Sequence, residues 1–92
     1  MLDIGQLLWD AWNMAHIARH AVTPQEVEEA CNQQAHVSQT YDQRLRVIGA
    51  TGQGRVLTLI LAPKEDTRYY PVTARPASRK ERQLFEHYRS AA

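Results

Sequence analysis

The segment "RLRVIGATGQGRVLTLILA", residues 44–62, restricts the fold more than any other part of the chain. Its first residues alternate between arginine and an aliphatic side chain, which is the pattern of a half-buried strand. A turn at 51–54 is followed by the apolar run 56–61, which is typical of a strand buried on both faces. We therefore expect a β-hairpin whose second strand is central in its sheet.

The chain on either side of this hairpin predicts further strands. "RYYPVTAR", residues 68–75, has the composition of a strand. Pro71 within it cannot donate a ladder hydrogen bond, so we expect an edge position or a β-bulge there. "AHVSQTY", residues 35–41, is a candidate for a short fourth strand.

Three helices are indicated by their start signals. In "TPQE", Thr23 is placed to cap a helix and Glu26 to reach back as the second half of a capping box. "SRKE", residues 78–81, repeats the same device, and Asp10 is the candidate cap of "DAWNMAHIARHA", residues 10–21. The order is helix, helix, three or four antiparallel strands, helix. We predict a single α+β domain over residues 1–92, with the helices covering one face of a meander.

Length and composition exclude several classes of protein. A chain of 92 residues forms one small domain, and no apolar run approaches the roughly 20 residues of a membrane span. The lone Cys31 cannot form an internal disulfide and is expected to be a small buried group. With no pattern of a secretory signal, we expect a cytoplasmic protein.

Charge is distributed unevenly along the chain. Residues 1–30 carry five acidic side chains and one basic side chain, whereas residues 31–92 carry ten basic and five acidic ones. In "TARPASRKER" four cations, Arg75, Arg79, Lys80 and Arg82, accompany only one carboxylate. Such a division favours a cationic face for an anionic partner, and a solvated surface with local ion pairs is the alternative.

Arginines mark the ends of the predicted strands. Arg46, Arg55 and Arg75 would approach one another if the meander brought them to the same end or face of the sheet. Guanidinium groups match phosphate oxygens and stay charged at any working pH, so a converged cluster would bind phosphate. The alternative is that each arginine is an ordinary surface residue.

Two histidines stand four residues apart on the first predicted helix. His16 and His20 have the spacing of two zinc ligands, but a third ligand with suitable spacing is missing, and we predict no metal site. A structural role, with hydrogen bonds to a neighbouring element, is one alternative. Proton transfer is another, because the pKa of histidine suits it at neutral pH.

Three segments together resemble the BrnT family of toxins from bacterial type II toxin–antitoxin systems. They are "WDAWNMAHIARHAVTPQEVEE", "RLRVIGATGQGRVLTLIL" and "YYPVTARPASRKERQLFEHY", and the resemblance spans roughly residues 9–88. It implies a RelE-like fold and metal-independent cleavage of RNA that arrests translation, with no cofactor. It also implies a cognate antitoxin with a DNA-binding domain, through which the complex would reach promoter DNA.

The resemblance also implies roles for particular residues. Arg55 and Arg75 are the expected phosphate and transition-state ligands, and Arg46 is the third catalytic arginine. His20 is the first candidate for proton transfer, with His16 and Tyr88 behind it. RNA binding is expected to involve Lys80, Arg79, Arg82, Thr73, Ser78, His16 and Tyr88.

The chain departs from the family pattern at two positions. Ala21 stands where glycine is common, so we expect a different link out of the first helix, and Ala50 stands where arginine is frequent. These departures keep a non-catalytic module that binds an antitoxin or nucleic acid as the alternative function.

The sequence also suggests how partners would be held. An acidic antitoxin segment that folds over the arginines would neutralise them. Base contacts could come from Tyr69, Tyr70 or Trp12.

Overall fold

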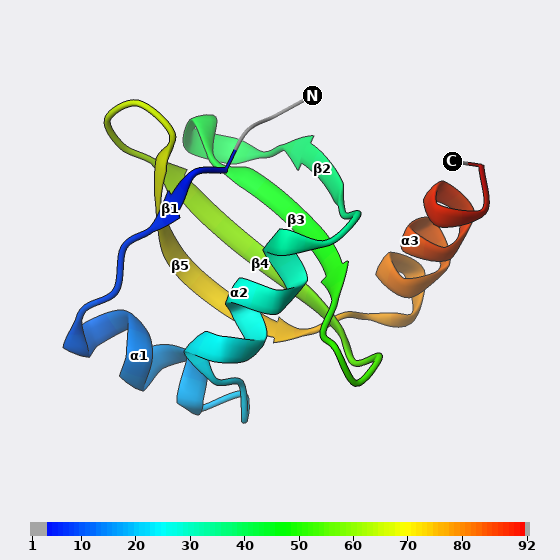
Figure 1. The fold of residues 1–92 in the computed structure, drawn as a ribbon, viewed down its shortest axis with the longest axis horizontal. Coiled ribbons are helices and arrows are strands. Elements are labelled where there is room, and N and C mark those ends of the chain that lie inside the picture. Colours follow the sequence, from blue (N-terminus) through cyan, green and yellow to red (C-terminus); the bar gives the residue numbers. More distant parts are fainter. Residues whose placement is uncertain (1–3, 92) are drawn as a thin grey trace.

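The computed structural model describes residues 4–91, which form three α-helices and a mixed sheet of five strands (Figure 1). A single 3-10 turn, Tyr41–Gln43, lies between the second and third strands. In chain order the regular elements are β1 (Gln6–Leu7), α1 (Ala11–Ala18), α2 (Pro24–Asn32), β2 (His36–Gln39), β3 (Leu45–Ala50), β4 (Val56–Pro63), β5 (Arg68–Pro76) and α3 (Arg79–Ala91). The α+β class predicted from the sequence is confirmed.

The sheet has the strand order β1-β5-β4-β3-β2, so β4 is central as predicted. Strands β2 to β5 form the expected antiparallel meander, and β2 is the suggested additional strand. The prediction of three or four antiparallel strands was wrong in one respect, because β1 pairs with β5 in parallel. A strand of two residues is too short to show a periodic pattern, so β1 could not be predicted.

Pro71 lies at an irregularity of the ladder, as expected. Ile60 pairs with Thr73, whereas the next residue, Leu61, pairs with Pro71, so Val72 is the extra residue of a bulge. The bulge accommodates a proline, which has no N–H to donate, near the middle of β5.

The helices lie on both faces of the sheet, which corrects the prediction that they cover one face. Leu57 and Leu59 of β4 belong to the main core together with Ile17 of α1 and Val27 of α2. A second, smaller cluster contains Phe85 of α3 together with Ile48 of β3 and Val56 of β4. These two strand residues are the sequence neighbours of Val47 and Leu57, which belong to the main core. Because successive strand side chains point to opposite faces, α3 packs on the face opposite to α1 and α2.

All three predicted helix starts are present. Thr23 and Glu26 form the reciprocal capping box of α2, and Asp10 forms one with Asn13 at the start of α1. At α3 the Glu81 N–H donates to Ser78 Oγ, and the Ser78 N–H donates to the Glu81 carboxylate. Each box satisfies N–H groups that have no partner inside the helix.

Ala21 adopts the left-handed conformation in which glycine is usual, with φ of 57°. The expectation of a different link after α1 was therefore wrong. The chain keeps the left-handed helix end and accepts the steric cost of a Cβ in this region, about 1 kcal/mol.

Replacing Ala21 by glycine should stabilise the protein. Relief of the steric cost exceeds the extra entropy of glycine in the unfolded chain, and we expect a gain of about 0.5–1 kcal/mol in the free energy of unfolding. Urea unfolding measures it, and Ala15→Gly inside α1 is the control, with an expected loss of similar size. Equal losses in the two variants would contradict this assignment.

Candidate nucleic-acid interface

Glu81 is the centre of the most connected polar cluster in the described residues. Its carboxylate accepts a bidentate pair from Arg75, with N–O distances of 2.7 and 2.9 Å, and a hydrogen bond from Thr58 Oγ1 at 2.9 Å. The Ser78 N–H adds a fourth donor at 2.8 Å. The Glu81 side chain is only 10% exposed, so these contacts fix the start of α3 against β4 and β5.

Arg46 approaches the same carboxylate from β3. Its Nη1 atom lies 4.0 Å from Glu81 Oε2, and its buried Nε has no hydrogen-bond partner within the described residues. Arg46 and Arg75 thus converge as predicted, with one shared carboxylate between them. Two guanidinium groups around a single negative charge leave a positive site.

The hydrogen bond from Arg75 is the main cause of the lowered pKa of Glu81. Burial opposes the shift, but further hydrogen bonds from the Ser78 N–H and from Thr58 support it, and the pKa falls to about 2. Glu81 is therefore ionised at neutral pH, and it holds both arginines in place without removing their combined charge.

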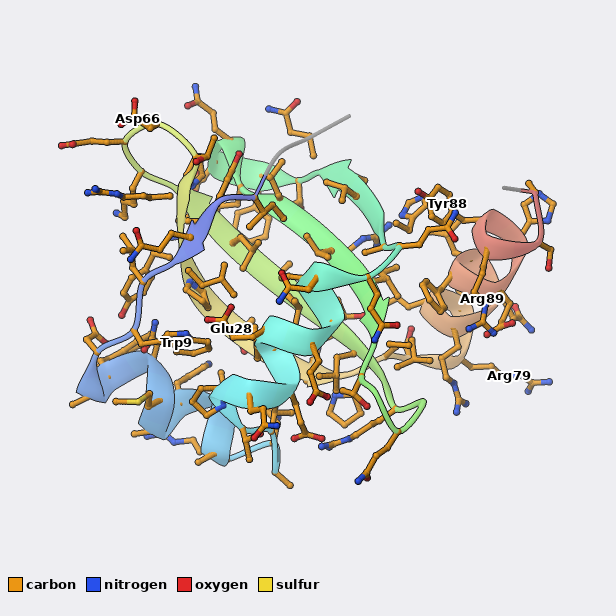
Figure 2. All side chains as sticks on the ribbon, in the orientation of Figure 1. Trp9, Glu28, Asp66, Arg79, Tyr88 and Arg89 are labelled. Atoms are coloured by element: carbon orange, nitrogen blue, oxygen red, sulfur yellow. The ribbon has the colours of Figure 1, made fainter. Side chains whose placement is uncertain are left out.

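The first turn of α3 adds three more cations to this cluster. Arg79, Lys80 and Arg82 are exposed, and none of them takes part in an ion pair within residues 4–91. Figure 2 shows the Arg79 side chain reaching outward from the start of α3. The helix N-terminus contributes a partial positive charge at the same place. We call this cluster the α3 site; its residues are Arg46, Arg75, Ser78, Arg79, Lys80, Glu81 and Arg82.

Thr73 lies beside the α3 site. It is half-buried and, two residues before Arg75 on β5, it shares the same face of the sheet. Its register partner on β4 is Ile60, which is in turn paired with Arg46 on β3. The row Arg46, Ile60 and Thr73 therefore crosses the sheet on this face.

Arg55 does not join the other two arginines, so the predicted cluster of three was wrong. Its side chain turns to the opposite face of the sheet, where Nη1 donates to Ala21 O at 2.7 Å and pairs with Glu26 at 3.0 Å. Nη2 lies 3.4 Å from His20 O. Arg55 and Arg75 are separated because they occupy positions of opposite parity in neighbouring strands. Arg55 binds the carbonyl groups that end α1 and links them to α2.

The two histidines of the sequence motif are also on the α1 side of the sheet. The His16 ring is stacked on Trp12, with centroids 5.0 Å apart and planes at 7°. The His20 ring meets His16 edge-on at 6.0 Å. Neither histidine belongs to the α3 site, so His20, the first candidate for proton transfer, lies apart from Arg46 and Arg75. Within residues 4–91, no group of three or more histidine, cysteine or acidic side chains is arranged to hold a metal ion.

Tyr88, the last predicted site residue, lies on α3 beside β2. Its ring packs edge-on against His36 at 5.4 Å, and Figure 2 shows it between α3 and β2. Both rings line a groove of about 820 Å³ whose lining contains no arginine or lysine. Cys31 also lines this groove, and burial raises the pKa of its thiol to about 12. This groove is thus separate from the cationic residues.

Comparisons with known proteins add no further identification. No protein-family model, curated protein or solved structure matches the chain. Among the described helices, none combines the length and the apolar character needed to cross a membrane.

Sequence reasoning missed the part that Glu81 plays in the site. Glu81 was expected only as half of a capping box, yet the same carboxylate also binds Arg75 and Thr58. The available signal was the spacing of six residues between Arg75 and Glu81 across the strand–helix junction. Thr58 had no signal, because its place opposite Arg75 depends on strand register.

The lowered pKa of Glu81 predicts a loss of stability in acid. Because its pKa is 4.5 without these contacts and about 2 in the folded protein, Glu81 stabilises the fold above pH 4.5 and loses this effect as the pH falls towards 2. We expect Glu81→Gln to lose on the order of 1–3 kcal/mol at neutral pH and to lack this part of the pH dependence. Chemical unfolding across this pH range measures both effects.

Glu86→Gln is the control for that experiment. Glu86 pairs with Arg89 on the exposed side of α3, where both side chains are about half exposed. An exposed pair contributes little, so this variant should keep the stability of the original protein. Identical pH profiles for the Glu81 variant and the original chain would contradict the assigned role.

Arg55→Ala should destabilise the fold, because it removes the guanidinium that binds both the end of α1 and Glu26. We expect a loss of about 1–3 kcal/mol in the free energy of unfolding. In a double-mutant cycle with Glu26→Gln, the two changes should couple by about 0.5–2 kcal/mol. Full stability of Arg55→Ala, or strict additivity of the two changes, would show that the contact is not structural.

Proposed function

We propose that this protein is an RNA-binding toxin of a type II toxin–antitoxin system and acts as a metal-independent endoribonuclease with a RelE-like fold. The observation that carries the proposal is the α3 site, in which Arg46 and Arg75 converge beside three exposed cations that have no ion-pair partner in the described part of the chain. The resemblance of the sequence to the BrnT family supports the same function. Arg55, which the resemblance also implied, has no part in the site proposed here.

The chemistry of the α3 site suits a phosphodiester. A guanidinium has more N–H donors than one carboxylate uses, so a substrate phosphate can bind Arg75 beside Glu81. Arg46 binds the carboxylate less closely than Arg75 does, at 4.0 Å, and among the residues that the structure describes its Nε has no hydrogen-bond partner. Arg79 and Lys80 extend the charge along the flanking backbone of the strand.

Cleavage without a metal would use the ribose 2′-OH as the nucleophile. As its proton passes to water, the 2′-oxygen attacks the adjacent phosphorus and gives a phosphorane whose added negative charge lies on the non-bridging oxygens, where Arg46 and Arg75 stabilise it. The P–O5′ bond then breaks, the 5′-oxygen takes a proton from water, and the products are a 2′,3′-cyclic phosphate and a 5′-hydroxyl. Ser78 Oγ and Thr73 Oγ1 are neutral donors at the edge of the site. Removal of one preorganised donor of this kind costs about 10²–10³ in rate. DNA lacks the attacking hydroxyl and would not be cut.

A non-catalytic RNA-binding or antitoxin-binding module is the second candidate. Two observations favour it: Glu81 already saturates one fork of Arg75, and His20 lies across the sheet from the arginines. In this alternative the α3 site holds RNA or an acidic partner segment, and the RNA stays intact.

An antitoxin would neutralise either form through the same surface. An acidic segment that orders over the first turn of α3 would pair with Arg79, Lys80 and Arg82 while excluding RNA. Because these cations are exposed, the complex should loosen as the salt concentration rises.

The test uses single-stranded RNA in EDTA. Cleavage that leaves 2′,3′-cyclic phosphate ends supports the nuclease, and binding without cleavage supports the module. The double variant Arg79→Ala/Lys80→Ala should bind RNA about 10- to 100-fold more weakly. Its salt dependence should be shallower, by about 1.4 in the slope of log K against log salt.

Lys64→Ala/Arg68→Ala is the matched control for this double variant. Both residues are exposed and lie at the β4–β5 turn, so the net charge changes equally while the α3 site stays intact. If the two double variants lost RNA affinity equally, the loss would be due to net charge alone, and the α3 site would not be the RNA interface. A requirement for zinc would overturn the metal-independent mechanism.

A further inference from the structure

Trp12 is an exposed aromatic residue on a helix that otherwise carries a buried stripe. It is 58% exposed, whereas Asn13 and Ile17 of the same helix are fully buried. By contrast Trp9, the other tryptophan, is partly buried and donates its indole N–H to Glu28 at 3.0 Å; both residues are labelled in Figure 2. Burial and a hydrogen bond give Trp9 a structural role. Neither explains why a tryptophan stands at position 12.

Three rings follow one another along this exposed side of α1. His16 is stacked parallel to Trp12 at 5.0 Å, and His20 meets His16 edge-on at 6.0 Å. Although His16 stacks on the indole, more than half of the Trp12 residue is exposed, so a ligand can reach it from solvent. We call Trp12, His16 and His20 the α1 stack.

On the described segment 10–22, which carries the α1 stack, no carboxylate is left without a hydrogen-bond partner. From Ala11 to Val22 the chain contains Arg19 and the two histidines and no acidic side chain. Asp10, the nearest carboxylate in sequence, is engaged as the cap of α1 and accepts a hydrogen bond from Tyr70. Exposed aromatic side chains are the groups on which proteins stack the unpaired bases of single-stranded nucleic acid.

We propose that Trp12, supported by the parallel His16 ring, stacks on an unpaired base of the same RNA that the α3 site binds. This inference rests on the proposed function. Of the aromatic residues suggested for base contacts, Tyr69 is buried in the core and the Tyr70 hydroxyl is bound to Asp10, which leaves Trp12. The α3 site holds phosphates without regard to sequence, whereas the α1 stack contacts a base.

The dimensions of the protein allow one strand to reach both places. Its longest extent is 35 Å. Even at the compact rise of a duplex strand, about 3.4 Å per nucleotide, a strand of about 12 nucleotides exceeds that length. Single-stranded sites of about 4–16 nucleotides are usual for small binding folds. Duplex RNA of the same length, whose bases are paired and stacked internally, cannot use the α1 stack.

The experiment compares base-bearing single-stranded RNA of about 12 nucleotides with an abasic strand of equal length and charge. Trp12→Ala should weaken binding of the base-bearing RNA about tenfold or more and leave binding of the abasic strand unchanged. Trp12→Phe should restore most of the affinity, because it keeps an aromatic face. In a Trp9→Phe background, where Trp12 is the only tryptophan, base-bearing RNA should quench the fluorescence and the abasic strand should not.

The outcomes separate this inference from the proposed function. If the original protein binds RNA and Trp12→Ala binds it equally well, stacking is wrong and the α3 site stands. An equal loss on both strands would assign Trp12 a structural role, and the loss of a protein partner with RNA binding intact would make it a protein contact; either result overturns the inference. If the original protein binds neither strand, the proposed function itself fails.

Discussion

Side chains alternate between the two faces of the sheet along β4 and its neighbouring strands. This alternation places the basic residues of β3, β5 and the start of β4 on two different surfaces. Leu57 and Leu59 face α1 and α2, whereas Thr58 faces the opposite side, where Glu81 and Arg75 lie. Arg55, two residues before Leu57, is consequently turned towards α1. Residues that are close along the sheet thus contribute to different surfaces, because a strand changes face at every residue.

Glu81 converts one of these surfaces into a defined site. A buried carboxylate needs several donors to stay ionised, and here Arg75, Thr58 and the Ser78 N–H supply them. The same contacts anchor the first turn of α3, so the cations of that turn are presented on a fixed helix. Hydrogen bonds from these donors offset the free-energy cost of burying the carboxylate. They also position the guanidinium groups in advance, and positioned donors bind a phosphate well.

Local sequence signals predicted the helices and strands well, whereas contacts between residues far apart in the sequence were predicted poorly. The three capping boxes and the hairpin follow from residues within a few positions of one another, so Thr23, Asp10 and Ser78 marked the helix starts correctly. The sheet face on which α3 packs depends on which hydrophobic cluster its apolar side chains join. The face towards which Arg55 points depends on the register of β4 with its neighbours. The convergence of Arg46 with Arg75 was predicted, but the acid that joins them was known only as a helix cap. Trp12 was one of several aromatic candidates, and burial alone distinguished it from Tyr69.

The most direct measurement is the mapping of amide chemical shifts in the isotopically labelled protein during titration with single-stranded RNA. If the α3 site is the phosphate-binding surface, the largest changes fall on residues 78–82 and on the Thr58 and Arg75 amides. Changes confined to the groove lined by Cys31, His36 and Tyr88, with the first turn of α3 unaffected, would contradict this assignment.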